Sequence, residues 1–321
     1  MMNLLPNSKR PISPLRPIMK HFFMTLTLLI TFSFCLSFVT ESNATDRGEY
    51  PNQSLLVETS ELSELMRNSD TILIDMRAEG YTDGHIPGAL WFGGITALVN
   101  GEHEVEHYLV DAADFQQLMR TVGVNQDSHI LIYDDGNGLG ASRLFYALNL
   151  YGHENSAVVN GGFAAWAAEG YPVETDGDIP APGNFSAEVN EARFCDVSFL
   201  TQNLERDDIV ILDARSPEEF SGEEQRSSRS GHIPGAVNLE WRNFVQIGED
   251  VPYFKSADEI ASLLEEKGIT PDKEVITHCQ TNVRGSHAFF TLRLMGYDSV
   301  RAYEGSWFEW GNREDTPVSG E

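Results

Sequence analysis

Residues 275–287 read Val-Ile-Thr-His-Cys-Gln-Thr-Asn-Val-Arg-Gly-Ser-His, a short apolar run followed by a polar loop and a helical pattern. The run predicts a strand that ends at Cys279, and the pattern predicts a helix that begins just after the loop. A cysteine at this junction lies near converging backbone N–H groups and a helix N-terminus, which stabilise a thiolate. We therefore predict that Cys279 is a nucleophile, with Arg284 as a fixed cation beside it. A buried core cysteine is the alternative.

The same pattern occurs once before in the chain. Residues 130–166 align with residues 274–310 without a gap, at a constant offset of 144. Repetition of this kind indicates a duplicated domain. Asp135 stands opposite Cys279, and a glycine stands opposite Arg284. The first copy therefore lacks both the nucleophile and the loop cation, and we expect no catalysis from it.

Each half alternates short apolar strands with helices. The strands expected at residues 71–75 and 209–213 both end at an aspartate, and the hexapeptide Gly-His-Ile-Pro-Gly-Ala follows at 84–89 and again at 231–236. This alternation predicts an α/β fold with two tandem domains, each a mainly parallel sheet flanked by helices. Ligands of such folds bind at the carboxyl ends of the strands. Arg215 and the cysteine loop both follow such ends, so we expect them to face one pocket.

The first 44 residues have the features of a secretory leader. An almost wholly apolar run at residues 22–39 follows several basic residues and precedes Ser-Asn-Ala at 42–44, whose small residues suit signal peptidase. We expect cleavage after Ala44 and a periplasmic or secreted protein that makes no membrane contact afterwards. A retained membrane anchor is the alternative, since the run approaches the roughly 18–20 residues that span a bilayer. Met19 is an alternative start.

Charge and cysteine content exclude several classes of function. The chain has 49 acidic and 22 basic residues and a formal net charge of −27, which argues against nucleic acid and anionic membranes as partners. Only Cys195 and Cys279 lie outside the leader, too few for a disulfide scaffold, and we expect Cys195 to have a packing role. No zinc-ligand spacing or nucleotide-binding glycine loop is present. We expect a monomer without metal or organic cofactor.

Composition also sets the predicted domain boundaries. The stretch at residues 174–186 is polar and contains two prolines, as is typical of a linker. The predicted segments are a signal peptide at 1–44, a tether at 45–54, an inactive domain at 55–173, the linker at 174–186 and a catalytic domain at 187–321.

Together, several motifs resemble the two-domain (tandem) rhodanese family. They are the doubled hexapeptide, Asp-Ala-Arg at 213–215, the Cys279 loop and Gly-Ser-Trp-Phe-Glu-Trp at 305–310. The resemblance covers essentially all of residues 55–321 and is strongest to thiosulfate sulfurtransferases of the bacterial type. It implies that Cys279 takes the sulfane sulfur of thiosulfate, releases sulfite, becomes a persulfide and passes the sulfur to cyanide or a thiol. The implied partners are a small-molecule donor and acceptor, with a thiol protein or reductant as a further acceptor.

The resemblance also implies a set of site residues. The N–H groups of residues 280–285 should cradle the persulfide, and Arg284 and Arg215 should bind the departing oxyanion. An ion pair with Asp213 is the alternative for Arg215, and core packing is the alternative for Trp241. The expected substrate-binding residues are Arg284, Arg215, Gln280, Thr281, Asn282, Val283 and Trp241.

Some positions depart from the better-known members of that family. Mitochondrial thiosulfate rhodaneses carry a basic residue directly after the cysteine and an arginine where this chain has Glu219; here Gln280 follows the cysteine. Arg226, Arg229 and Arg242 could compensate. Mercaptopyruvate-type enzymes carry a Cys-Gly-Ser-Gly-Val loop, which this chain lacks, so thiosulfate is the expected donor. A 3-mercaptopyruvate sulfurtransferase and a non-turnover persulfide carrier remain alternatives.

The loop length argues against a phosphatase. Phosphatases of this fold place five residues between cysteine and arginine, and here there are four. Four histidines lie in or near these motifs. His85 and His232 occur in both copies, so we expect them to be structural, whereas His278 and His287 flank the loop and leave a catalytic role open.

Overall fold

A computed structural model of the protein describes residues 49–177, 179–246 and 250–320, which belong to one compact unit. The predicted signal peptide and the alternative start at Met19 lie outside the described residues. None of the helices in the described ranges has the length and apolar character that crossing a bilayer requires.

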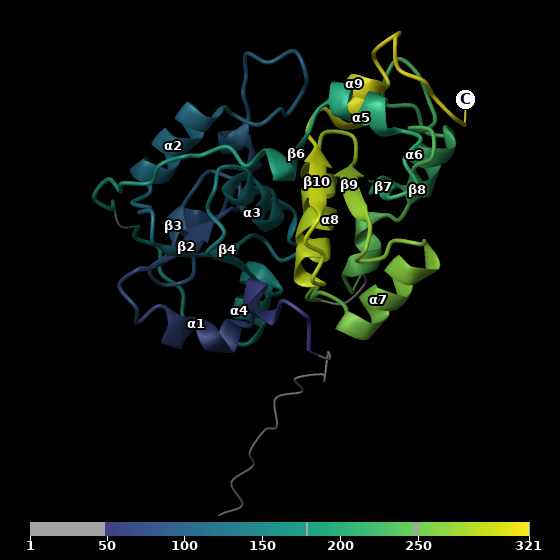
Figure 1. The fold of residues 1–321 in the computed structure, drawn as a ribbon. Coiled ribbons are helices and arrows are strands. Elements are labelled where there is room, and N and C mark those ends of the chain that lie inside the picture. The colour runs from purple at the N-terminus through teal and green to yellow at the C-terminus, as the bar shows by residue number, and fades with distance from the viewer. Residues whose placement is uncertain (1–48, 178, 247–249, 321) are drawn as a thin grey trace, which may run out of the picture. The chain divides into compact units, whose positions relative to one another are not determined.

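The first half contains a five-stranded sheet in the order β1-β5-β4-β2-β3, with parallel pairing throughout (Figure 1). Its strands are β1 Leu56–Val57, β2 Thr71–Asp75, β3 Leu90–Trp91, β4 His129–Tyr133 and β5 Ser156–Val159. Its helices are α1 Thr59–Leu65, α2 Ala112–Thr121, α3 Leu139–Leu150 and α4 Gly162–Ala168, with short 3-10 helices at η1 Gln53–Leu55, η2 Tyr81–Asp83 and η3 Ile95–Leu98.

The second half repeats this arrangement in the order β6-β10-β9-β7-β8. Its strands are β6 Phe194–Cys195, β7 Ile209–Asp213, β8 Val237–Asn238, β9 Glu274–His278 and β10 Val300–Tyr303. Its helices are α5 Val197–Asn203, α6 Pro217–Ser221, α7 Ala257–Glu266, α8 Val283–Leu294 and α9 Ser306–Trp310, with 3-10 helices at η4 Glu191–Arg193 and η5 Trp241–Phe244. The identical strand order confirms the predicted α/β class and the two tandem domains.

Helices cover both faces of each sheet, as the alternation of strand side chains requires. In β4, Ile130 and Ile132 belong to one hydrophobic cluster, whereas Leu131 and Tyr133 belong to another. Helix α2 begins directly after Asp111, because the carboxylate of this residue caps the first turn by accepting from backbone N–H groups at 2.9 and 3.0 Å.

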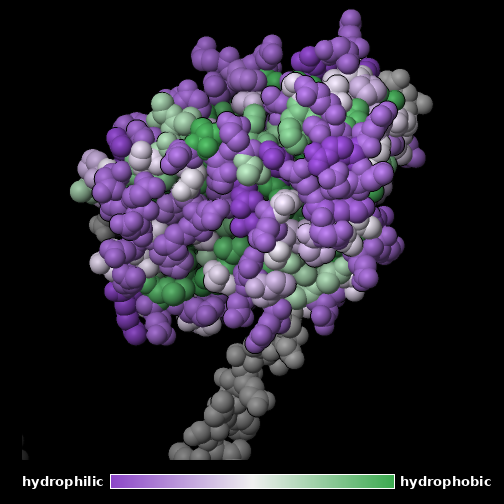
Figure 2. All heavy atoms as spheres, viewed as in Figure 1, coloured by the Kyte–Doolittle hydropathy of each residue, from purple (hydrophilic) through white to green (hydrophobic). Residues whose placement is uncertain are grey.

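The two halves share a continuous core between α3 and α8 (Figure 1). Ring centroids of Phe145 and Phe290 are 4.9 Å apart, and those of Tyr146 and Phe289 are 5.2 Å apart. Edge-on aromatic pairs of this kind add to the stability gained from apolar burial. The surface seen in Figure 2 is mostly hydrophilic, so apolar side chains are concentrated in the interior.

Both segments expected to be loose connections make ordered contacts. In the expected tether, Asn52 donates from its backbone to Leu294 O at 3.0 Å and from its side chain to Arg293 O at 2.7 Å. In the expected linker, Phe185 is fully buried and its backbone N–H donates to Val124 O at 3.1 Å. The described parts of these segments therefore pack on the domains.

Candidate active site

Cys279 directly follows the carboxyl end of β9 and is 1% exposed. Its N–H donates to the Ser306 hydroxyl at 3.3 Å, and its carbonyl accepts from Trp307 N at 2.9 Å. The next carbonyl, of Gln280, accepts from Phe308 N at 2.8 Å. Helix α9 therefore fixes the backbone on both sides of the cysteine.

Beyond the cysteine, the loop turns through Asn282, which has a left-handed backbone with φ +58° and is followed by the first residue of α8. Within the described part of the chain, the backbone N–H groups of residues 280–285 form no hydrogen bond to a protein acceptor. Unpaired N–H groups at the start of a helix attract negative charge. The loop therefore presents a set of free donors beside the Cys279 sulfur.

The first copy shows what such a loop holds. There the carboxylate of Asp134 accepts four backbone N–H bonds, from Gly136 at 2.9 Å, Gly138 at 3.1 Å, Gly140 at 2.9 Å and Ala141 at 3.2 Å. At the offset of 144, these donors correspond to the N–H groups of residues 280, 282, 284 and 285. The first loop is thus filled by its own anion, whereas the corresponding residue of the second copy is His278.

His278 itself is fully buried, and its Nε2 lies 3.6 Å from the Asp213 carboxylate. Burial lowers the pKa of this imidazole, although the nearby Asp213 opposes the shift. A neutral histidine at this position leaves the N–H groups of the loop available to the cysteine sulfur.

Arg284 lies beside Cys279 and is held by Glu219. Its guanidinium forms two hydrogen bonds to the Glu219 carboxylate, one of them at 2.9 Å. Burial opposes the positive charge of Arg284, but the bonds to Glu219 and the neighbouring thiol raise its pKa. Arg226, which is half exposed, also contacts Glu219, at 3.3 Å. One carboxylate is therefore shared by two arginines at the edge of the loop.

The Glu219 pair makes stability depend on pH. Burial would raise the pKa of Glu219, but the hydrogen bonds from Arg284 outweigh it and lower that pKa below the usual 4.5. A carboxylate whose pKa is lower in the folded state stabilises the fold above its unfolded pKa, and this contribution is lost as the pH falls. We expect the free energy of unfolding to fall between about pH 5 and 3, and less steeply in Glu219→Gln. Urea unfolding at several pH values in this range measures the effect, and Glu218→Gln, at an exposed position, is the control. If the free energy of unfolding fell equally steeply with pH in both variants, the prediction would be contradicted.

Arg215 is buried and makes the contacts of its alternative role. It is 1% exposed, and its guanidinium bonds to the Asp213 carboxylate at 2.6 and 3.0 Å and to Gly231 O at 2.9 Å. It also lies 4.5 Å from the Trp307 ring centroid. Its Nε and Nη2 groups are therefore used in a buried ion pair with Asp213 and a bond to Gly231, which favours the alternative role, whereas oxyanion binding by Arg215 stays a prediction.

The first copy contains the same ion pair. Arg77 bonds to Asp75 at 2.6 and 3.0 Å and to Gly84 O at 2.9 Å. We expect Arg77→Met and Arg215→Met to destabilise the protein by a similar amount, about 3–5 kcal/mol, because each leaves a buried carboxylate unpaired. Denaturant unfolding of the two variants checks this. An Arg215 variant of wild-type stability with a raised KM for the sulfur donor would restore the binding role.

The other residues expected in the site differ in their contacts and burial. The Gln280 side chain is buried and donates to Ser227 Oγ at 3.1 Å, so it anchors the loop to residues 226–227. Thr281 and Val283 are half buried within the loop. Trp241 is buried and lies edge-on to His287 at 5.3 Å, as core packing predicts.

His287 and two of the arginines lie in surroundings that do not suit catalysis. His287 stacks on Phe254 at 5.1 Å, and burial lowers its pKa to about 3, so the imidazole is neutral. Arg229 is bound to the C-terminal segment through Thr316 at 2.6 and 2.7 Å. Arg242 is 61% exposed and contacts Glu240.

Two residues near the loop were missed by sequence reasoning. Arg143 on α3 and Glu304 at the end of β10 form a buried ion pair between the two halves. The alignment of the copies contained a signal, because it places Arg143 opposite His287 and Glu304 opposite Asn160. Like the difference between Asp135 and Cys279, these two differences between the copies are visible in the sequence.

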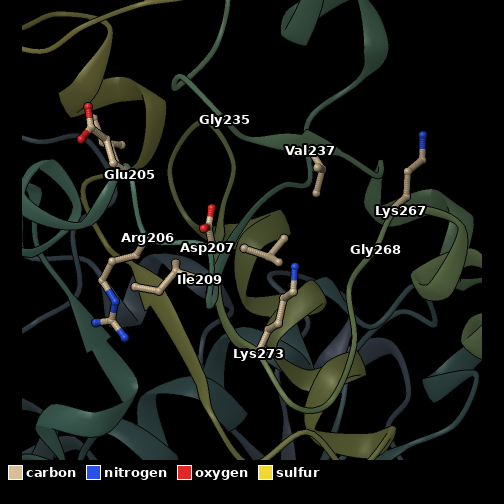
Figure 3. A pocket seen from close by; sticks show the side chains of 11 residues that line it. Glu205, Arg206, Asp207, Ile209, Gly235, Val237, Lys267, Gly268 and Lys273 are labelled. Carbon is tan, nitrogen blue, oxygen red and sulfur yellow. The ribbon is translucent and has the colours of Figure 1, made fainter.

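A surface pocket lies away from this loop (Figure 3). It is found where β7 and β9 begin, whereas Cys279 follows the opposite end of β9. Its charged lining residues are Glu205, Arg206, Asp207, Lys267 and Lys273. No group of three or more His, Cys, Asp or Glu side chains suited to a metal ion occurs in the described ranges.

Comparison with known proteins places both halves in one group. The family described as rhodanese-like domain matches the chain twice, over residues 58–169 and 196–313. A thiosulfate sulfurtransferase of Pseudomonas aeruginosa is 34% identical over 265 residues, 82% of this chain and 96% of the relative. A 3-mercaptopyruvate sulfurtransferase of Escherichia coli is 35% identical over 245 residues, 75% and 85% of the two chains. A crystal structure of an Escherichia coli protein described as a 3-mercaptopyruvate sulfotransferase with the rhodanese fold matches with a TM-score of 0.70 at 30% identity, covering 79% of this chain and 98% of the other.

Proposed function

The chain belongs to the rhodanese family of two-domain sulfurtransferases, and we propose that it moves the sulfane sulfur of thiosulfate through a persulfide on Cys279. The observation that carries this proposal is the loop that follows Cys279. Its N–H groups correspond to those that hold the Asp134 carboxylate in the first copy, and within the described residues no side-chain anion occupies them. A negatively charged sulfur on Cys279 would complete that arrangement.

The proposed first step loads the cysteine. The Cys279 thiolate attacks the outer sulfur of thiosulfate, the sulfur–sulfur bond of thiosulfate breaks, and sulfite leaves with the electron pair. Cys279 then carries a second sulfur atom, and the negative charge lies on that atom, where the loop N–H groups stabilise it. In the second step cyanide, or the thiolate of an acceptor, attacks the outer sulfur and the Cys279 thiolate is restored.

Arg284 is the cation that meets the departing sulfite in this proposal. It is bound to Glu219 and is close enough to Cys279 for the thiol to influence its charge, so it can meet a group that leaves the sulfur. Because Glu219 neutralises part of this charge and the whole chain is strongly acidic, we infer that thiosulfate binds with modest affinity.

The proposal is tested by mixing the purified protein with thiosulfate and cyanide and following thiocyanate. Turnover is expected with thiosulfate and should exceed that with 3-mercaptopyruvate, the donor of the first alternative. One equivalent of persulfide without turnover would indicate a carrier, which passes its sulfur to a thiol protein. Neither loading nor turnover with either donor would refute sulfur transfer, and hydrolysis of a phosphate ester would favour a phosphatase.

We propose further that the protein acts outside the cytoplasm as a monomer, after removal of residues 1–44. The support is the apolar run at 22–39 followed by small residues at 42–44. N-terminal sequencing of the exported protein is expected to read Thr45-Asp46-Arg47. A sequence that starts at Met1 or Met19 would contradict cleavage and favour the retained anchor.

A further inference from the structure

A buried cation from the inactive half reaches the neighbourhood of the Cys279 loop. Arg143 on α3 is 1% exposed and pairs with both carboxylate oxygens of Glu304, at 3.0 Å to Oε2. Its guanidinium also donates to His107 O at 3.0 Å and lies 3.4 Å from the Ser286 hydroxyl on α8. Burial disfavours the charge on Arg143, but the carboxylate of Glu304 outweighs this effect and raises its pKa, with a smaller contribution from Cys279.

Glu304 connects this cation to the loop. Its Oε2 accepts from the side-chain amide of Asn282 at 2.7 Å, and its Oε1 accepts from Leu109 N at 2.9 Å. Asn282 is the loop residue with φ +58°, a left-handed backbone conformation that most residues avoid and that asparagine adopts less readily than glycine. The hydrogen bond from its amide to Glu304 therefore favours the loop conformation that presents the N–H groups to the sulfur.

The inactive copy has the same left-handed backbone conformation at the corresponding position, but without these side chains. Its corresponding residue is Gly138, with φ +78°, and a Cβ there would lie 3.3 Å from His287 Nε2. Opposite Glu304 it has Asn160, whose side chain accepts from Phe254 N at 3.0 Å. Opposite Arg143 stands His287, which is neutral. The group of Arg143, Glu304 and Asn282 thus surrounds only the loop that carries the cysteine.

We infer that Arg143 is a positioning residue for the Cys279 loop, supplied by the half that has no nucleophile. It fixes Glu304, and Glu304 fixes Asn282 in the left-handed conformation that orients the loop N–H groups toward the sulfur. The catalytic consequence rests on the proposed sulfur transfer, whereas the effect on the loop does not. This role gives the inactive half a specific contribution to the site.

The test removes both charges together, because removing Arg143 alone would leave Glu304 buried and unpaired. In Arg143→Met/Glu304→Gln, we expect the rate of Cys279 loading by thiosulfate, measured as sulfite release in a single turnover, to fall about 10- to 100-fold, as for other residues that orient a reacting group. The KM for thiosulfate should change much less. Adding Asn282→Gly, which supplies the residue of the inactive copy, should restore most of the rate, because glycine adopts the left-handed conformation unaided.

Two further variants separate positioning from general loss of structure. Asn160→Ala removes the hydrogen bond with Phe254, which joins the two halves at the position that corresponds to Glu304. Because this change lies outside the site, the loading rate should stay within about twofold of wild type. Arg143→Lys keeps the charge and should retain an intermediate rate, with thermal unfolding followed for every variant.

A second readout keeps the inference independent of the donor. The rate of Cys279 alkylation by iodoacetamide is expected to fall in Arg143→Met/Glu304→Gln and to return with Asn282→Gly. If the wild type fails to take sulfur from thiosulfate, the proposed function fails while the alkylation rates still decide the role of Arg143. Loading and alkylation rates equal to wild type in the double variant, or no recovery with Asn282→Gly, would overturn the inference.

Discussion

Replacing Cys279 with alanine is expected to lower thiocyanate formation from thiosulfate and cyanide by more than about 1,000-fold, as removal of a nucleophile does in other covalent mechanisms. Both proposed steps pass through a bond to this sulfur, so the variant has no route to the persulfide. Because Cys279 is 1% exposed and small, the alanine variant should remain folded. Mass spectrometry after incubation with thiosulfate should show one added sulfur atom in the wild type and none in the variant.

The chain offers two matched controls for this prediction. Cys195→Ala removes the other cysteine of the described residues, which is fully buried in β6, and should keep wild-type turnover once its stability is allowed for. Asp135→Cys, placed in the Cys279→Ala background, puts a thiol at the corresponding position of the first copy. We expect no recovery there, since the Asp134 carboxylate already fills the loop N–H groups. Undiminished turnover in Cys279→Ala would refute the proposed mechanism.

Much of the fold could be predicted because its signals are local. The strands expected at residues 71–75 and 209–213 form as β2 and β7, and the helix expected just after the cysteine loop forms as α8. Apolar runs and capping residues act over a few positions, so the sequence displays them directly. Because the sequence repeats, the elements predicted for one half also apply to the other, and both sheets do have the same strand order.

The first copy contains a sequence signal for the structural contacts of Arg215. The sequence Asp-Ala-Arg at 213–215 has a counterpart in Asp-Met-Arg at 75–77, in the half that has Asp135 opposite Cys279. A residue pair that persists without catalysis is better explained by structure than by substrate binding. In both copies the arginine bonds to the aspartate two residues before it and to the carbonyl of a distant glycine.

The ion pair of Arg143 and Glu304 could not be predicted from local patterns. These residues are 161 positions apart and lie in different halves. Nearly all residues of α3 are buried, so the helix has no polar face that would show which side chain meets the other half. Only the packing of α3 on α8 brings the guanidinium to the loop, and periodicity does not specify that contact.

The second large effect concerns the cation at the leaving group. In Arg284→Met/Glu219→Gln, we expect kcat/KM for thiosulfate to fall about 100-fold, similar to the loss of one donor at a developing anion. The double change avoids leaving Glu219 with only the exposed Arg226 as its partner, because its charge would then repel thiosulfate and mimic the loss of Arg284. Arg226→Met is the matched control, because Arg226 contacts the same carboxylate from a side chain that is 47% exposed. Its effect should stay within about threefold, as for other exposed ion pairs.

Glu219→Gln alone should then act in the opposite direction. In the resting protein Arg284 is held by two hydrogen bonds from its guanidinium to Glu219, so an incoming thiosulfate must compete with a carboxylate for that guanidinium. Replacing the carboxylate with an amide removes a negative charge from the site and weakens the competing contact. We expect a KM for thiosulfate that is severalfold lower than wild type, most clearly at low salt, where electrostatic effects are least screened. Steady-state kinetics at two ionic strengths measures this; a higher KM in Glu219→Gln would mean that Glu219 holds Arg284 in its working position, and that the pair acts as one unit.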